Sequence, residues 1–210
     1  MFRELLRQKL AGVASLSPHE LRALEEHYEL LVRWNRVLNL TSIEGLAEAV
    51  ERHYCESVFL AVHLPAGACR LVDLGSGAGF PGLPVAVLRP DCTVTLVEAH
   101  RRKAVFLREA SRQLPHVRVL SARFGEVTEA PFDRVISRAV SYEDLTPALK
   151  RIGRAADLLT GEEGPPESLG FVWETPMRLP WGRNRFLRSG VPREAPKVSV
   201  SRETVSRSFT

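Results

Sequence analysis

The sequence predicts an α/β domain built on a parallel sheet and preceded by a helical section. Residues 1–65 carry apolar side chains at helical spacing and show no strand pattern. From Cys69 onward, short apolar runs alternate with intervals of helix length, and the first run ends in a glycine-rich turn. Because alternating strands and helices are typical of parallel sheets covered on both faces, we expect helices on each side of this one.

The composition fits a single domain without a membrane segment. The chain has 210 residues, of which 44% are hydrophobic, enough for a packed core. No run of about 18 apolar residues occurs, so we expect no membrane span. Residues 1–16 place basic side chains between apolar ones at helical spacing, which favours an amphipathic helix over a signal peptide. Cys55, Cys69 and Cys92 form no CxxC pair, so we expect neither a disulfide scaffold nor a bound metal. A cytoplasmic protein is the simplest interpretation.

Three helices are expected in the N-terminal section, over residues 2–13, 18–38 and 44–63. The start of the second helix has the clearest signal. Ser17 can cap it, Glu20 can complete a capping box, and Pro18 suits the first turn. We expect one structural domain with three parts: a helical section (1–65), a core (66–190) and a basic C-terminal arm (191–210).

Four strands are expected in the core, over residues 69–74 (CRLVDL), 93–98 (TVTLVE), 116–121 and 132–137. We expect the first to be central in the sheet and adjacent to the second. The interval 100–114 has the apolar spacing of a helix. Residues 161–170 combine turn residues and charge without periodicity, which indicates a loop. Beyond it, FVWETP and RNRFL are expected to form a terminal β-pair, and the chain after about Gly190 to form an extended arm.

The central motif is LVDLGSGAGFPG (71–82), a strand that leads into a glycine-rich turn and then a helix. Glycine reaches positive φ without a Cβ clash and lets a ligand approach the backbone closely. The helix N-terminus adds free N–H groups and a partial positive charge, which suit the carboxylate of S-adenosylmethionine. We therefore expect Asp73, Gly75, Gly77 and Gly79 to bind this cofactor.

Glu98 ends the next strand, 23 positions after Gly75. A carboxylate there can accept hydrogen bonds from both ribose hydroxyls. Because ligands bind beyond the carboxyl ends of the strands in such sheets, we expect the glycine turn and Glu98 on the same ligand. A dinucleotide site is the competing interpretation, since residues 77–82 match GxGxxG. The acid before the first glycine, Asp73, favours the methyl donor over NAD.

The stretches VDLGSGAGFPGLPVAVLRP, LVE, KAVFLREA and FDRVISRA together resemble the glucose-inhibited division protein B family. Residues 34–41 are similar to that family's WN…NLT segment. Residues 52–57 are similar to its RH…DS segment, although Glu56 stands where Asp is usual. The resemblance covers about residues 20–142. It implies a Rossmann-like class I S-adenosylmethionine-dependent methyltransferase, with an N-terminal helical extension, that makes 7-methylguanosine in bacterial 16S ribosomal RNA.

The same resemblance implies cofactor contacts for Gly75, Phe80, Phe124, Gly125 and Arg138. Phe124 and Gly125 follow the third strand, where they could flank adenine. The alternative is that Phe124 is an ordinary core residue. Arg138 ends the fourth strand and could meet the cofactor carboxylate or an RNA phosphate, or else form a surface ion pair.

The C-terminal third departs from the family. GEEGPPESLG stands near the place of the usual segment ending in Lys-Gly. Residues 179–187 only loosely resemble the closing LP…RHL hairpin, with Phe186 in place of His. The family's substrate contacts therefore transfer to this chain less directly than its cofactor contacts.

Guanine N7 has a free lone pair, so its methylation needs no general base and positioning carries most of the catalysis. We therefore name no catalytic acid or nucleophile. His53 and Arg123 are candidates for orienting the base or its phosphate, although a single His in a helical section is often structural. The target guanine must be exposed or swung out, because N7 lies on the deep, narrow major-groove edge of paired RNA.

The charge of the chain is uneven. Residues 171–210 hold eight Lys or Arg and three Glu, a local charge of +5 in a chain of net charge +4. This segment predicts an anionic partner, and we expect Arg183, Arg185 and Arg188 to contact RNA phosphates. A solvated tail is the alternative.

The expected partner is 16S ribosomal RNA or the small ribosomal subunit, with no membrane or DNA partner and with the protein acting as a monomer. Two other functions stay open. One is methyl transfer to a different RNA, a protein or a small molecule. The other is RNA binding by a protein that holds the cofactor without catalysis.

Overall fold

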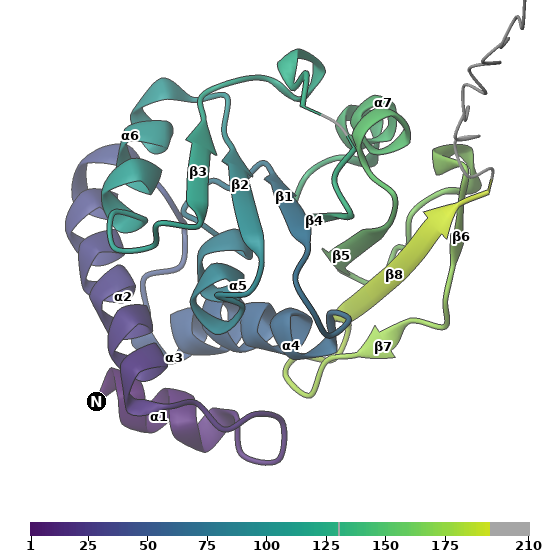
Figure 1. Cartoon of the computed structure of the whole chain (residues 1–210). Helices are drawn as coiled ribbons and strands as arrows, with labels where there is room; N and C mark the ends of the chain where they lie inside the picture. The colour runs from purple at the N-terminus through teal and green to yellow at the C-terminus, as the bar shows by residue number, and fades with distance from the viewer. Residues whose placement is uncertain (130, 194–210) are drawn as a thin grey trace, which may run out of the picture.

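The computed structural model describes residues 1–129 and 131–193. Its N-terminal section is helical, as the sequence predicts, and packs beside a central sheet (Figure 1). The helices are α1 (Phe2–Lys9), α2 (Pro18–Leu38), α3 (Leu46–Ala49) and α4 (Glu56–His63). A π-helical stretch over Val50–Cys55 joins α3 to α4, so residues 46–63 are continuously helical, close to the predicted span.

The predicted capping box at the start of α2 is confirmed. Ser17 Oγ accepts a hydrogen bond from Glu20 N (3.2 Å), and Glu20 Oε2 accepts one from Ser17 N (2.6 Å). The α1 helix ends earlier than predicted, at Lys9, because the chain turns through Gly12 with a φ of 79°. A left-handed residue cannot continue a right-handed helix.

Within the described residues, eight strands form one sheet in the order β3-β2-β1-β4-β5-β8-β6, with β7 paired to β8. The first five are β1 (Arg70–Leu74), β2 (Thr93–Val97), β3 (Val117–Leu120), β4 (Arg134–Arg138) and β5 (Ala156–Thr160), all parallel. The strand that leads into the glycine turn, β1, pairs with β2 on one side and β4 on the other. The prediction that CRLVDL is central and adjacent to TVTLVE is therefore confirmed.

Helices cover both faces of the sheet, as predicted. They are α5 (Gly82–Leu88), α6 (Arg101–Ala110) and α7 (Tyr142–Ile152), with a 3₁₀ turn at Phe124–Glu126. Side chains of neighbouring strand residues point to opposite faces. Leu71 accordingly joins the apolar layer shared with α2, α4, α5 and α6, whereas Val72 joins the layer shared with α7.

The C-terminal part of the sheet is larger than the predicted β-pair. Its strands are β6 (Phe171–Trp173), β7 (Met177–Arg178) and β8 (Phe186–Pro192). β8 runs antiparallel to β5, β6 and β7. The segment predicted as an extended arm after about Gly190 is thus strand as far as Pro192, and residues 194–210 lie outside the described part. Residues 161–170 form a loop, as predicted, with one 3₁₀ turn over Glu167–Leu169.

None of the described helices is long and apolar enough to cross a bilayer. The three cysteines are free thiols. Cys69 and Cys92 precede β1 and β2, and their sulfurs lie 2.7 Å apart, a proximity that their spacing in the sequence does not predict.

Candidate functional site

The glycine turn between β1 and α5 lies against the end of β2. Val97 O accepts hydrogen bonds from Gly75 N (3.0 Å) and Ser76 N (3.1 Å). Gly75, Gly77 and Gly79 all have positive φ, at 77°, 54° and 93°. A Cβ at Gly75 would lie 2.5 Å from Val140 Cγ2 and 3.5 Å from Phe124 Cζ. Glycine is therefore required at Gly75 both by backbone conformation and by the close approach of the turn after β4.

Asp73 connects the two ends of the glycine turn. Its Oδ2 accepts a hydrogen bond from Gly82 N (3.0 Å), which ties the end of β1 to the start of α5. The side chain is fully buried, and Oδ1 has no hydrogen-bond partner within the described residues. Burial raises the pKa of this carboxyl to about 7. The structure thus gives Asp73 a contact within the turn, and its predicted contact with the cofactor stays a prediction.

Glu98 lies at the rim of the turn, where the sequence predicts it. Its Oε2 accepts a hydrogen bond from Gly77 N (2.9 Å), and its Oε1 accepts one from His100 N (2.7 Å). Each carboxylate oxygen can accept a second hydrogen bond. The carboxylate is therefore held in place by the backbone and retains acceptor capacity for hydroxyl groups of a ligand.

Phe124 and Gly125 border a cavity with a volume of about 530 Å³. Ala99, the residue after Glu98, lines the same cavity, as does Arg123. Arg151 Nη2 donates to Phe124 O (2.8 Å), which fixes this turn to α7. The Phe124 ring packs partly against the apolar layer on the α7 side, so it belongs both to the core and to the wall of this cavity.

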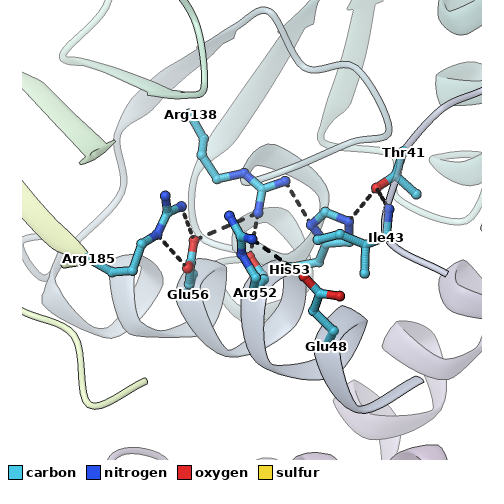
Figure 2. A network of polar contacts seen from close by, with 8 residues as sticks. All are labelled: Thr41, Ile43, Glu48, Arg52, His53, Glu56, Arg138 and Arg185. Carbon is cyan, nitrogen blue, oxygen red and sulfur yellow. Dashed lines mark hydrogen bonds and ion pairs between the residues drawn. The ribbon is translucent and has the colours of Figure 1, made fainter. Parts of the chain in front are cut away.

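Arg138, at the end of β4, meets the helical section at His53 (Figure 2). Its Nη2 lies 2.9 Å from His53 Nδ1, and its Nη1 donates to Arg52 O. The guanidinium also lies over the Phe80 ring, 5.3 Å from its centroid, and the His53 ring stacks on Phe80 at 4.4 Å. The Phe80 side chain is buried by these contacts. Arg138 thus adjoins the glycine turn at Phe80, and the cofactor contacts predicted for both residues stay predictions.

The contacts of His53 determine its tautomer. Because an arginine can only donate, Nδ1 must be the unprotonated nitrogen, and Nε2–H then donates to Thr41 Oγ1 (2.9 Å). Burial, with the nearby Arg138 charge, lowers the pKa of His53 to about 3. His53 is therefore neutral and orients Arg138. Its predicted contact with substrate stays a prediction.

Glu56 is a buried carboxylate between two arginines (Figure 2). Arg185, the residue before β8, binds it through two hydrogen bonds, Nε to Oε1 (2.9 Å) and Nη2 to Oε2 (2.8 Å). Arg138 Nη1 lies 3.8 Å from Oε2. Burial lowers the pKa of Arg138 to about 10, which leaves it cationic at neutral pH. The position where the family usually has Asp thus joins the helical section to β4 and β8.

The three arginines predicted to contact RNA have different surroundings. Arg183 is exposed, and its side chain forms no hydrogen bond or ion pair within the described residues. Arg185 is bound to Glu56. Arg188 donates from Nε to Thr160 Oγ1 (3.0 Å) and from Nη2 to Glu162 O (3.1 Å). Their contact with RNA stays a prediction, with Arg183 the most available of the three.

His27 is a site residue that the sequence analysis missed. This buried side chain of α2 bonds through Nε2 to Ala78 O (3.1 Å), in the glycine turn, and through Nδ1 to Tyr54 Oη (3.0 Å). Burial lowers the pKa of His27 to about 4, so Nε2 donates to the carbonyl and Nδ1 accepts from the tyrosine. The available signal was a histidine on the apolar face of a predicted helix, which does not reveal its partner.

Several known proteins are similar in sequence to this chain. A family model described as rRNA small subunit methyltransferase G matches residues 20–157. The chain is 37% identical over 185 residues to the ribosomal RNA small subunit methyltransferase G of Methylobacillus flagellatus, covering 83% of this chain and 89% of that protein. The chain belongs to this family. The protein of the same name from Chromobacterium violaceum is 40% identical over 140 residues, covering 65% of this chain and 66% of that protein.

Solved structures share the fold of this rRNA small subunit methyltransferase G family member. A SAM-dependent methyltransferase from Aquifex aeolicus matches with a TM-score of 0.55 and 16% identity, covering 68% of this chain and 92% of that chain. Aeropyrum pernix fibrillarin, in complex with natively bound S-adenosyl-L-methionine, matches with a TM-score of 0.54 and 15% identity, covering 67% of this chain and 75% of that chain. The predicted Rossmann-like class I fold is therefore confirmed.

As a member of the rRNA small subunit methyltransferase G family, the protein is an S-adenosylmethionine-dependent methyltransferase. Its residues fit that donor. The turn is open at Gly77, where a Cβ would meet only Gly75 O at 3.8 Å, and Glu98 presents its carboxylate at the rim. The adjoining cavity at Phe124 has a volume of 530 Å³, within the range of roughly 300–1,000 Å³ typical of ligand pockets.

Proposed function

We propose that this methyltransferase transfers the methyl group to N7 of a guanine in 16S ribosomal RNA. The observation that carries the proposal is the family match over residues 20–157, which includes the glycine turn, Glu98 and Arg138. The buried histidines beside the turn support a reaction without a general base. His27 and His53 are both neutral, and each has both ring nitrogens in hydrogen bonds.

We further propose how the chain holds the donor. S-adenosylmethionine supplies an electrophilic methyl group on a positively charged sulfur. Glu98 would accept hydrogen bonds from ribose hydroxyls, and Phe124 with Gly125 would flank the adenine in the 530 Å³ cavity. Arg138, kept cationic and oriented by His53, would face the carboxylate of the donor or a phosphate of the RNA. Gly75, Gly77 and Gly79 would let the donor approach the backbone.

The chemistry requires positioning more than proton transfer. The N7 lone pair forms the bond to the methyl carbon as the carbon–sulfur bond breaks, and its electron pair stays on sulfur. The positive charge moves from sulfur to the purine ring, and no proton is transferred. The protein therefore needs to bring N7 in line with the carbon–sulfur bond and to hold both reactants there. Arg123, at the rim of the donor cavity, is available to orient RNA.

The test is to map 7-methylguanosine in 16S RNA from cells with and without this protein, by chemical cleavage at the modified base. We expect one guanosine to lose its methyl group in the absence of the protein and to regain it when purified protein and donor are added. An unchanged map, together with methylation of another RNA, a protein or a small molecule, would support the alternative substrates. Donor binding without methylation of any of these would support a non-catalytic RNA-binding protein.

We also propose that the protein acts as a cytoplasmic monomer on the 16S RNA or the small subunit. The exposed arginines near β7 and β8 support an RNA partner, because phosphate contacts are mostly made by such side chains. Sedimentation of the protein alone and with small subunits would measure both states. A stable dimer in the absence of RNA would contradict the monomer.

A further inference from the structure

A second cavity lies next to the donor site, between the carboxyl ends of β4 and β5. Its volume is 520 Å³, and its walls are the turn after β4 (138–142) and the segment after β5 (160–163). Val140 lines it, and Val140 Cγ2 is the atom 2.5 Å from the position of a Cβ at Gly75. One side chain thus separates this cavity from the glycine turn. The turn is also strained, since Ala139 has a φ of 57°.

The cavity is suited to a flat heterocycle beside the donor. Tyr142 lines it together with Leu145 and Leu158, two apolar residues. Its volume is large enough for a nucleoside, since ligand pockets typically measure roughly 300–1,000 Å³. Because ligands in such sheets bind beyond the carboxyl ends of the strands, the position also agrees with a substrate site.

Glu162 and Glu163 line this cavity, and the surroundings of their carboxylates differ. Their backbone is held in place: Tyr142 Oη donates to Glu163 O (3.2 Å) and Arg188 Nη2 donates to Glu162 O (3.1 Å). Glu162 Oε2 accepts a hydrogen bond from Asn184 Nδ2 (2.8 Å). The Glu163 carboxylate accepts no hydrogen bond and forms no ion pair within the described residues.

Glu162 and Glu163 make this side of the cavity acidic, whereas the anionic RNA backbone attracts basic side chains. Two arginines line the cavity, Arg138 and Arg185. Both lie at the Glu56 carboxylate, Arg185 at 2.8 Å and Arg138 at 3.8 Å, and neither forms an ion pair with Glu163 within the described residues. A free carboxylate suits a base edge that offers two adjacent N–H donors, because an ionised carboxylate is an acceptor only. Guanine has such an edge in its N1–H and N2–H groups, whereas adenine, cytosine and uracil do not.

We propose that this cavity receives the target guanine and that Glu163 binds its N1–H and N2–H groups. The inference rests on the proposed function, in which N7 of guanine is the methyl acceptor. Methyl transfer gives the purine ring a positive charge, which makes N1–H and N2–H stronger donors. A carboxylate on that edge therefore interacts more strongly with the transition state than with the unreacted base, which accelerates the reaction.

The first test compares Glu163→Gln with Glu162→Gln, two neighbouring changes that each remove one charge from the same wall. Single-turnover methylation of unmethylated small subunits at saturating RNA should be about 10- to 100-fold slower in Glu163→Gln. It should be within about threefold of the parent in Glu162→Gln, whose carboxylate is bound to Asn184. Donor affinity should be unchanged in both. Equal rates in the parent and Glu163→Gln, or a larger loss in Glu162→Gln, would overturn the assignment.

The second test changes the base. Small subunits reconstituted with inosine at the target position lack the N2 amino group. The parent should methylate them about tenfold or more slowly than guanosine subunits, and Glu163→Gln should lose most of this discrimination. A merely structural role of Glu163 would slow both substrates equally, and that result would contradict the proposal.

The third test needs neither donor nor methyl transfer. Titration calorimetry with 7-methylguanosine monophosphate and guanosine monophosphate, at mildly acidic pH to retain N1–H, should show that the parent prefers the cationic nucleotide. Glu163→Gln should bind the two nucleotides equally. A parent that binds both equally would overturn the base-binding site. If the parent instead shows the preference but makes no 7-methylguanosine in 16S RNA, the proposed function fails and the base-binding site stands.

Discussion

Glu56 and Arg185 form a bidentate ion pair that joins α4 to the residue before β8 across 129 residues of sequence. The carboxylate is 1% exposed and the arginine 25% exposed. Arg138, on β4, is the second cation near the same carboxylate. The pair therefore links the helical section, the donor site and the C-terminal strands, and it uses an arginine that the charge pattern alone assigns to RNA.

We predict that Arg185→Ala lowers the free energy of unfolding by about 3 kcal/mol, because it leaves the buried Glu56 with one distant cation. Arg183→Ala, in the same segment but exposed, should change it by less than about 0.5 kcal/mol. Urea denaturation measures both. In a Glu56→Gln background, Arg185→Ala should cost much less, and equal costs in the two backgrounds would refute the coupling.

The close approach of Val140 to the glycine turn leads to a second prediction. Gly75 and Gly12 have nearly equal φ, 77° and 79°, but only a Cβ at Gly75 would meet a neighbouring atom within 4 Å. We expect Gly12→Ala to cost about 1 kcal/mol from backbone strain alone. Gly75→Ala should cost about 2–3 kcal/mol and should abolish donor binding.

Thermal or urea unfolding and donor titration check these effects. Adding Val140→Ala to Gly75→Ala should restore part of the lost stability, because it removes the clashing methyl group. If the double variant is no more stable than Gly75→Ala, the clash with Val140 is not the cause.

Glu98 leads to a third prediction, on the donor. Glu98→Ala should weaken S-adenosylmethionine binding by about 1–3 kcal/mol, because it strands the ribose hydroxyls and releases Gly77 N and His100 N. Glu109→Ala, on the outer side of α6, is the control and should bind normally. Calorimetry that finds unchanged affinity in Glu98→Ala, or tighter binding of NAD than of the methyl donor by the parent, would exclude this assignment.

The buried ionisable groups around the turn predict how stability depends on pH. His27 and His53 have folded pKa values of about 4 and about 3, below the ordinary 6.5, so unfolding takes up protons between those values. Each histidine therefore makes the fold less stable as the pH falls from 6.5 towards 4, by up to ~1.4 kcal/mol per pH unit. Asp73 acts in the opposite direction, because its folded pKa of about 7 lies above the ordinary 3.8.

These groups together should give a net loss of about 1.4 kcal/mol per pH unit on acidification between pH 6 and 4.5. Asp73→Asn removes the opposing contribution, so its stability should fall about twice as steeply over that range. Urea denaturation at several pH values measures the slopes. Equal slopes for the parent and Asp73→Asn would contradict the raised pKa of Asp73.

The RNA interpretation gives the last prediction. Replacing Arg185 would confound RNA binding with stability, so the informative variant is Arg183→Ala. If Arg183 contacts a phosphate, its loss should weaken RNA binding and reduce the slope of log affinity against log salt by about one. Arg112→Ala, an exposed arginine after α6, is the control. Filter binding at several salt concentrations measures the slopes, and equal slopes for parent and Arg183→Ala would remove Arg183 from the interface.

Local patterns were sufficient for much of the architecture. The capping box at Ser17, the central position of CRLVDL and the proximity of Glu98 to the glycine turn all follow from spacing and turn chemistry within short segments. These features depend on neighbours in sequence or on the strand order typical of doubly wound sheets, in which the first strand lies at the centre. The bounds of β5 and α7 were not predicted, because their apolar residues do not stand out from the segments around them.

The partners of individual polar side chains could not be read from the chain. Arg185 binds Glu56, His27 bonds to Ala78 O, and Glu163 lines a cavity next to the donor turn. Each of these relations joins segments that are far apart in sequence and meet only when the sheet and its covering helices pack. Periodicity determines which face of an element is buried, but the packing of distant elements determines which charged groups are paired there and which remain free to bind a substrate.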